Sequence, residues 1–339
     1  ANNSKLSVQE LETAGLLDKA SIILTPTGYS EDVIHNVKPS ATLFGDMTHI
    51  LASTSATRVN EDGLVATVVT RDVPRIDYSK GKGAILTELA SVNQIRYSED
   101  FSNALWVKSA ITLASSTSTN PKGESQTVYT ISGQPTSGDG LNAPFASTPS
   151  GQGTGVSVWI RKTAGSGATG NVWIGTGNQS SGIGNTVAVG SSWQRITYAS
   201  PGTGGGAIYI NPEYSYTFEV WGAQGEKSSA LGREGMVSSY IPTVSTSVTR
   251  PRDNYLNGGD ASLIGAQEGV FYIEAAVLAD SGISKAVALS ASNSPANRVV
   301  IFYSSTSNTI QGRVQASTST TIAINGTVTN NTDFNKIAF

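Results

Sequence analysis

The sequence predicts a mostly β protein with many turns, and three features of its composition lead to this prediction. Charged residues make up only 14% of the 339 residues, against about 25% in an ordinary soluble domain. Glycine is abundant, with 36 residues, and serine and threonine are frequent throughout. Apolar residues still reach 38%, which is too many for a disordered chain. Small polar residues in place of Lys and Glu favour strands and turns over helices.

One short helix is predicted near the front of the chain. Ser7 followed by Glu10 is a capping-box pattern, Val8 and Leu11 fall on one side, and Gly15 is a stop signal. A helix of about two turns is too short to be stable alone in water. We therefore expect it to pack either against its own chain or against a partner.

The remainder of the N-terminal segment, residues 16–93, contains loops and short apolar stretches such as 21–24 and 64–69. This apolar pattern is too discontinuous for a large independent core. We expect residues 1–94 to become ordered against a neighbouring structure.

Residues 95–253 are predicted to form a β-sandwich of the jelly-roll type. Short segments with strand patterns are separated by Gly- and Ser-rich turns. All five tryptophans lie in this stretch, which indicates a substantial core. Trp159 and Trp221 sit in alternating strands, so we expect both to face inward. The predicted strands are 156–160, 172–174, 193–198, 207–210 and 216–221.

Residues 254–339 are predicted to begin a second β-sandwich, reached by an extended linker over 241–253. Asn325-Gly326 is a hairpin-turn signal, and residues 336–339 resemble the beginning of another strand. The part of this unit with strand patterns, from residue 269 onward, has about 70 residues, which is small for a sandwich, so we infer that this unit is incomplete in the given sequence. Its predicted strands are 269–275, 298–303 and 310–314.

Several classes of protein are disfavoured by the composition. The net charge is −3 and no Lys/Arg cluster is present, so we expect no nucleic-acid partner. No apolar run approaches the roughly 18 residues that cross a bilayer, so we expect no membrane insertion. The chain has no cysteine, which fits synthesis in a reducing cytosol and excludes disulfide bonds.

No cofactor or metal site is predicted. Residues 165–170 match the G-x-G-x-x-G dinucleotide pattern, but a strand rather than a helix follows, so we interpret them as a hairpin loop. The only histidines, His35 and His49, lie in the N-terminal segment, away from the β domains that would have to hold a zinc site or a catalytic triad. Asp139 in a Gly-rich stretch fits a turn better than a calcium loop.

No catalytic residue is predicted either. A glycosidase needs only two carboxylates, and Glu213, Glu219 and Glu226 are available. Acidic residues are expected on any protein surface, so we do not assign them a catalytic role.

Three tyrosines are candidates for contact with a glycan: Tyr209, Tyr214 and Tyr216. Exposed aromatic rings can stack on the apolar faces of sugars. Aromatic residues in strands are, however, mostly core residues. Tyr214, which lies near Pro212 in a predicted turn, is the best exposed candidate.

A set of motifs in this chain resembles a family of phage tail and appendage proteins. Residues 52–64 (ASTSATRVNEDGL) are similar to the family's RASTATRVNxDGL signature, and 73–78 (VPRIDY) follow. Residues 97–106 (YSEDFSNALW) come next, in the family's usual order. The closing motifs are 220–226 (VWGAQGE), 239–243 (SYIPT) and Thr249-Arg250.

The resemblance covers roughly residues 40–252. It implies a jelly roll similar to carbohydrate-binding modules between the YSEDF and YIPT motifs, followed by a concanavalin/laminin-G-like sandwich. It implies no catalytic residues. The chain departs from the pattern at 50–51, where IL replaces TR, at 87–93, which match loosely, and in an insertion over 227–237.

The motifs also have a physical interpretation. Arg58, Arg75 and Asp77 are charged groups in a weakly charged stretch, so they are candidates for ion pairs that hold irregular segments to the jelly roll. Pro74 and Pro242 fix extended backbone at either side of it.

The resulting expectation is a non-enzymatic virion structural protein, a head or tail fibre or appendage assembled in the host cytoplasm. Residues 1–94 would attach it to other virion proteins, and it would form a homotrimer, as fibres commonly do. The alternative is an adhesin module that binds a host cell-surface glycan. A polysaccharide depolymerase is the third and least favoured function.

Overall fold

The computed structural model describes the protein in a series of segments. Within them, regular structure is almost entirely β, so the predicted mostly β fold is confirmed. The predicted helix at 7–14, apart from Thr13, and the predicted strand at 21–24 lie outside the described residues. No helix in the described segments is long and apolar enough to cross a membrane. The described residues are 13, 15, 29–30, 33–36, 45–51, 54–68, 71–133, 139–147, 153–200, 205–227, 237–256, 268–277, 285–290, 297–317 and 319–339.

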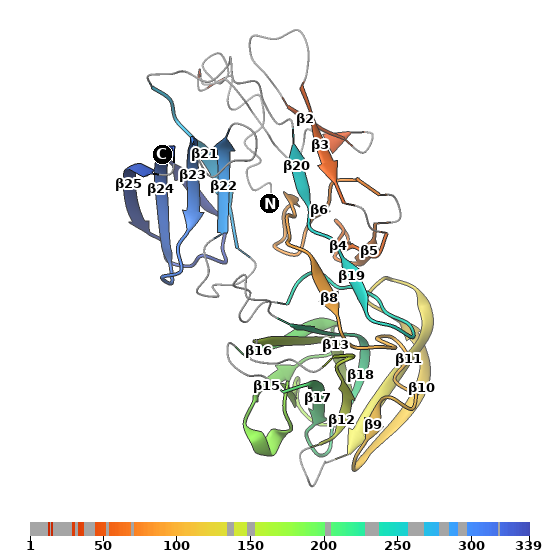
Figure 1. Ribbon diagram of the computed structural model, residues 1–339. Coiled ribbons are helices and arrows are strands. Elements are labelled where there is room, and N and C mark those ends of the chain that lie inside the picture. The colour runs from red at the N-terminus through yellow and green to blue at the C-terminus, as the bar shows by residue number, and fades with distance from the viewer. Residues whose placement is uncertain are drawn as a thin grey trace.

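Ten strands of the central region form two antiparallel five-stranded sheets (Figure 1). They are β9 Val107–Lys108, β10 Ile111–Thr119, β11 Ser125–Gly133, β12 Leu141–Pro144, β13 Thr154–Ala164, β14 Gly170–Gly175, β15 Gly184–Val189, β16 Gln194–Ser200, β17 Ala207–Pro212 and β18 Thr217–Lys227. The first sheet has the order β10-β11-β18-β13-β16, and the second has the order β15-β14-β17-β12-β9. The predicted strands of this region are all present.

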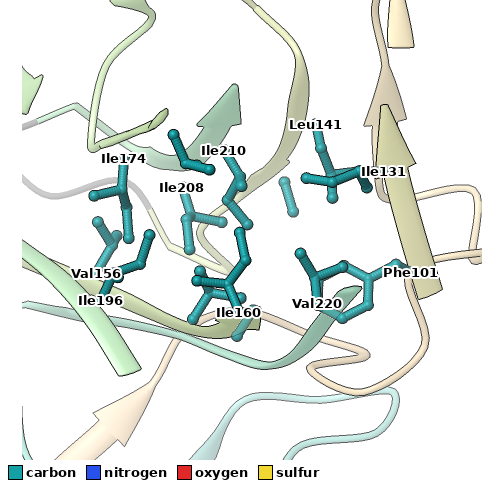
Figure 2. Close-up of a cluster of buried hydrophobic side chains, with 14 of the residues drawn as sticks. Phe101, Ile131, Leu141, Val156, Ile160, Ile174, Ile196, Ile208, Ile210 and Val220 are labelled. Atoms are coloured by element: carbon teal, nitrogen blue, oxygen red, sulfur yellow. The ribbon is translucent and has the colours of Figure 1, made fainter. Parts of the chain in front are cut away.

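The main core lies between these two sheets, and Figure 2 shows its branched side chains interdigitating. Alternate residues of each strand contribute, because successive side chains of a strand point to opposite faces. Fully buried members include Val156, Ile160, Ile174, Ile208 and Ile210.

The outer face of the first sheet carries a second core. Trp159 on β13 pairs in register with Trp221 on β18, and both lie on the face opposite Val158 and Val220. Trp221 is fully buried with Val65, Val128 and Tyr240, and Trp159 packs against this cluster. The prediction that both side chains face inward is correct in that both are covered. The core that they face lies on the outer face of the first sheet, however, and not between the two sheets.

The N-terminal segment supplies part of that cover. It contains the small antiparallel pairs β4–β5 and β6–β7. The amide of Val65 donates to the carbonyl of Pro121 at 2.9 Å, and the hydroxyl of Thr57 donates to the carbonyl of Tyr240 at 2.6 Å. Residues 54–68 are thus ordered against the jelly roll, as expected for this segment, while most of residues 1–44 lie outside the described residues. The bounds are β4 Thr57–Val59, β5 Val65–Thr67, β6 Ile76–Asp77 and β7 Ala84–Ile85.

The chain enters and leaves the jelly roll through two paired strands. Strand β8 (Ser91–Asn93) pairs antiparallel with β19 (Val248–Arg250). Strand β20 (Asn254–Leu256) then pairs with β3 (Gly45–Ile50), which extends the sheet β1 (Tyr29–Ser30), β2 (Val33–Asn36) and β3. The predicted linker is therefore built into strands that join the N-terminal segment.

Within the described residues, six strands form the C-terminal unit, drawn in blue in Figure 1. They are β21 Tyr272–Ala275, β22 Lys285–Ser290, β23 Arg298–Tyr303, β24 Thr309–Ala316, β25 Ser319–Thr327 and β26 Asn335–Ala338. Strands β22 to β25 form one antiparallel sheet in sequence order, and β21 pairs with β26. The hairpin turn predicted at Asn325-Gly326 is wrong: both residues lie inside β25 and pair with β24.

The Gly-rich loop at 165–169 also differs from its prediction. It links β13 to β14, which belong to different sheets, so it is a crossover and not a hairpin. The buried Lys162 ammonium donates to the carbonyls of Ser166 at 2.8 Å and of Gly167. The loop is thus closed around a lysine of its own chain.

Candidate functional site

A buried charge network joins the N-terminal segment to the strands that flank the jelly roll. At its centre the guanidinium of Arg75, fully buried, contacts Glu88 at 2.9 Å and the carboxylate of Asp253. The same guanidinium donates to the carbonyl of Thr57 at 3.0 Å and to the hydroxyl of Ser239 at 2.9 Å. One side chain therefore connects four separate stretches of the sequence.

Arg250 and His49 complete this network. Arg250 lies 3.4 Å from Glu88 and 3.8 Å from Asp253, and it donates to the carbonyl of Leu89 at 2.9 Å. His49 Nε2 lies 3.2 Å from Asp253 Oδ1. Two arginines thus meet two carboxylates, so their charges balance. We define the charge network as Arg75, Glu88, Arg250, Asp253 and His49.

The arginines set the protonation of the carboxylates. Burial alone raises the pKa of Glu88, but Arg250, Arg75 and hydrogen bonds from Ser239 outweigh it and hold the pKa at about 2. The pKa of Asp253 is also lowered: burial opposes this, and the hydrogen bond with His49 and the contacts with Arg75 prevail. Both carboxylates remain ionised in the interior at neutral pH.

A second polar layer surrounds Asn93, which is fully buried at the end of β8. Its amide nitrogen donates to the carbonyls of Ala223 and Ile241, at 3.1 and 2.8 Å. Its oxygen accepts from the amides of Ile95 and Gly225, both at 3.0 Å. These bonds hold β18, which contains the VWGAQGE motif, and the YIPT segment to β8, the strand through which the chain enters the jelly roll.

The predicted ion-pair residues have different roles. Arg75 forms ion pairs, as expected. Arg58 instead donates to the carbonyl of Ile76 at 2.7 Å, and Asp77 accepts from the amide of Val59 at 2.7 Å. These two hydrogen bonds join β4 to β6 within the N-terminal segment, and neither Arg58 nor Asp77 forms an ion pair with another described residue.

The three candidate carboxylates are not brought together. Glu219 pairs with Arg161 at 2.6 Å and accepts from Ser116 and Ser118. Glu226, seven positions along β18, accepts from the amide of Ser238 at 2.6 Å and from the hydroxyl of Ser91. Glu213 is exposed before the β17–β18 turn. The described residues contain no group of three His, Cys, Asp or Glu side chains placed to hold a metal ion.

The three candidate tyrosines also occupy different surroundings. Tyr214 is 66% exposed at the β17–β18 turn. Tyr216 packs against the main core, with its ring 6.2 Å from that of Phe218 and 5.0 Å from the Lys162 ammonium. Tyr209 lies on β17 between the core residues Ile208 and Ile210, so its side chain is on the outer face of the second sheet.

The same outer face carries Trp173, which sequence reasoning assigned only to a strand. A Cβ atom on Gly184 would lie 2.5 Å from the Trp173 ring, and one on Gly175 would lie 3.0 Å from its Nε1. The indole therefore lies over two glycines of neighbouring strands. Gly175 pairs in register with Tyr209, which places both aromatic side chains on adjacent strands. The signal in the sequence is a glycine two positions after a strand tryptophan.

Polar groups border these aromatics. The amide of Asn142, paired in register with Tyr209, donates to the carbonyl of Asp139 at 3.1 Å. The amide of Asn178 lies 3.3 Å from the Asp139 carboxylate. Burial and the nearby Asp139 raise the pKa of Tyr209 above its usual value. We define the aromatic face as Trp173, Tyr209, Asn142 and Asp139.

Comparisons with known proteins find similarity in structure alone. No family model matches the sequence, and no curated protein matches it. Among solved structures, the CBM22-1–GH10 modules of endo-1,4-β-D-xylanase 10B from Clostridium thermocellum, complexed with xylohexaose, match 45% of this chain and 30% of that one. That match has 12% identity and a TM-score of 0.31.

Two further solved structures are similar over nearly their whole length. A putative sugar-binding protein from Bacteroides thetaiotaomicron matches 40% of this chain and 100% of its own, with 9% identity and a TM-score of 0.27. The CBM22-1 xylan-binding domain of Xyn10C from Paenibacillus barcinonensis matches 41% and 97%, with 11% identity and a TM-score of 0.28. At these scores the likeness carries no argument about what this chain binds.

Proposed function

We propose that this protein is a structural component of a phage particle, a head or tail fibre or appendage. The observation that carries the proposal is the position of the motif residues. Arg75 comes from the VPRID motif and Arg250 from the closing motif, and both meet in the charge network. Tyr240 of the YIPT motif and Trp221 of the VWGAQGE motif pack together, with ring centroids 5.0 Å apart. The motif residues thus hold parts of the fold together.

A structural role also fits the contacts of the buried carboxylates, all of which are to protein groups. Glu88, Asp253, Glu219 and Glu226 each accept hydrogen bonds or ion pairs from protein groups. A general acid or base must instead face the reacting group. We therefore propose a non-enzymatic protein, attached to other virion proteins through residues 1–94 and assembled as a homotrimer.

The virion assignment is tested on purified particles. Mass spectrometry of density-purified phage from cells that encode this chain should detect its peptides at a constant ratio to the capsid protein. Antibodies raised against the jelly roll should label one fixed position on the particle in electron microscopy. Peptides that remain in the soluble lysate and never band with particles would contradict the proposal.

A second candidate function is glycan binding, and the aromatic face favours it. An indole supported by two glycines, a neighbouring tyrosine ring and amide groups suits a sugar, since rings stack on C–H faces and amides bond to hydroxyls. We propose a host cell-surface glycan as the ligand of this face.

A glycan array on the full chain tests this second function. Trp173→Ala should abolish the binding that wild type shows, whereas Tyr214→Ala, at the exposed turn, is the matched aromatic control. Loss with Tyr214→Ala alone would move the site to the turn, and an array without any bound glycan would remove the function.

A further inference from the structure

The outer face of the second jelly-roll sheet is open to solvent across its width, unlike the outer face of the first sheet. The N-terminal segment helps to cover the first sheet around Trp221. On the second sheet, Thr186 of the edge strand β15 and Val107 of the edge strand β9 are both exposed, the latter at 50%. Trp173 and Tyr209, which lie between these edges, are half-buried. A ligand can therefore reach this face from one edge to the other.

One row of side chains runs across all five strands of this face. Residues that pair directly in an antiparallel sheet share a face, so the registers align one residue from each strand, in the order β15, β14, β17, β12 and β9 (Figure 1). The Trp173 indole covers the two glycines at one end. With neighbouring strands about 4.8 Å apart, the row extends over roughly 19 Å. We define the cross-strand row as Gly184, Gly175, Tyr209, Asn142 and Val107.

The segments of sequence that build this face carry very little charge. Residues 165–193, which contain β14 and β15, include no charged residue. Residues 134–160, which contain β12, include only Asp139, and residues 201–216, which contain β17, include only Glu213. Both of these charges are negative.

The charged groups nearest to the face are arranged against an anionic ligand. Burial and the nearby Asp139 carboxylate raise the pKa of Tyr209, so the field at the centre of the row is negative. Glu213 is exposed directly after β17. Lys108 is the one cation within the five strands, and it shares the inner face with the core residue Leu141. An anion above the row would therefore meet a like charge and no cation from these strands.

We propose that the cross-strand row selects uncharged glycans and rejects acidic ones. The hydroxyls and C–H faces of a neutral sugar find the Asn142 amide and the two aromatic rings. A carboxylate, sulfate or phosphate on the glycan would instead lose hydration without gaining a cation, and it would approach Asp139. This inference rests on the proposed glycan-binding function and adds the class of glycan to it.

The test is an array of bacterial surface polysaccharides probed with the full chain. Each acidic polysaccharide is printed twice, in its native form and after carboxyl reduction, which converts uronic acids to neutral sugars. Wild type should bind neutral polysaccharides, and it should bind a reduced form about threefold or more strongly than its native form. Stronger binding to native acidic forms, lost in Trp173→Ala, would overturn this inference and leave glycan binding in place. An array without any bound glycan would remove both.

Thr186→Lys and Val107→Lys test whether the row itself sets this selectivity. Each variant places an ammonium group at one end of the row, at an exposed position that the fold tolerates. Each should raise the ratio of native to carboxyl-reduced binding by about threefold. Circular dichroism melting curves establish that each variant is folded.

Val244→Lys is the matched control. Val244 is 73% exposed and lies outside the second sheet, so the same change in net charge should leave the ratio at its wild-type value. An equal rise in all three variants would overturn the proposal, because net charge rather than the row would then set the selectivity. A ratio that neither Thr186→Lys nor Val107→Lys alters would overturn it as well.

Discussion

Arg75 and Arg250 carry two positive charges into the interior, where a single unpaired ion costs several kcal/mol. The cost is offset because Glu88 and Asp253 accept ion pairs from both arginines, and because carbonyls and a hydroxyl accept from other guanidinium N–H groups, although the Nε of Arg250 has no hydrogen-bond partner among the described residues. Such a network discriminates strongly between one geometry and others, since any displacement leaves a buried charge unpaired. A single substitution that removes one charge of the network should therefore strongly lower the free energy of unfolding.

The first prediction concerns Glu88→Gln. The variant keeps the shape of the side chain but leaves two buried guanidinium groups facing a single remaining carboxylate. We expect the free energy of unfolding to fall by about 3–5 kcal/mol, measured by urea denaturation. Glu213→Gln, at an exposed position, is the control and should change it by less than about 0.5 kcal/mol. Equal effects of the two changes would contradict this account.

The second prediction concerns pH. The pKa of Glu88 is about 2 in the folded protein against an ordinary 4.5. A lowered pKa stabilises the fold above the ordinary value, and this contribution, about 3 kcal/mol, is lost as the pH falls from about 4.5 towards 2. The melting temperature should drop over this interval in wild type. In Glu88→Gln the drop should be shallower, and parallel curves would argue against the assignment.

At the residue scale the sequence identified some participants and missed others. Arg75 stood out because charge is rare around it, and it forms the expected ion pairs. Glu88 and Asp253 carried no signal, because their partners lie 13 and 178 positions away from them along the chain. Tyr209 was chosen for its type, but Trp173 was not, since only sheet registry places the two on neighbouring strands.

At the scale of single elements, β14 shows how glycines position an aromatic ring. Gly175 and Gly184 pair across β14 and β15, and the Trp173 indole occupies the space that two Cβ atoms would need. Strand glycines are usually costly, because they gain no packing of their own. Here the glycines provide a flat surface on which the indole of Trp173, two positions before Gly175, packs.

The third prediction concerns this support. Gly184→Val places a side chain where the indole lies, so Trp173 must move away from the sheet. We expect weaker glycan binding together with stronger quenching of tryptophan fluorescence by iodide. Gly190→Ala is the control, because nothing lies within 4 Å of a Cβ at that position. Unchanged quenching in Gly184→Val would show that the ring does not depend on the glycine.

Strand positions were predictable, but their connections were not. Period-two alternation located β13, β14, β17 and β18 because each buries alternate side chains in the core. The Asn325-Gly326 sequence does not form a turn, since these residues lie inside β25 and pair with Gln311 and Ile310 of β24. The reversal occurs instead near Ser317, whose φ of 59° is unusual for a residue other than glycine.

At the scale of the whole molecule, the N-terminal segment and the jelly roll share one buried surface. Trp221 packs with Val65 from the N-terminal segment and Tyr240 from the YIPT motif. The charge network lies beside this contact and joins the same parts. The C-terminal unit has its own core around Ile301, Tyr303 and Ile310. We therefore expect two cooperative units rather than three.

The fourth prediction follows from that division. Trp221→Ala should cost about 3–5 kcal/mol and accelerate hydrogen exchange both in residues 54–68 and in the jelly roll, while the C-terminal unit is unaffected. Mass spectrometry of exchanged peptides measures all three regions. Trp193→Ala, at the edge of the same cluster, should have a much smaller effect. Exchange confined to the jelly roll would contradict a shared unit.

The organisation of the whole chain was only partly visible in the sequence. The N-terminal segment looked dependent on a neighbour because its apolar residues are few and scattered, and the structure gives it one. That residues 248–256 return to this segment could not be predicted, since β19 and β20 pair with strands more than 150 positions earlier. Such distant pairing leaves no local pattern.

The pairing of β8 with β19 has a consequence for how this architecture changes over time. Asn93 and Val248 are register partners, so the jelly roll begins and ends at adjacent points, as inserted domains do. Recombination could exchange everything between them without altering the strands on either side. What limits such an exchange is the outer face of the first sheet, because a replacement module must again present an apolar surface for Val65 to cover. The β8–β19 pair thus allows one module to replace another, and the contact between Trp221 and Val65 limits which modules fit.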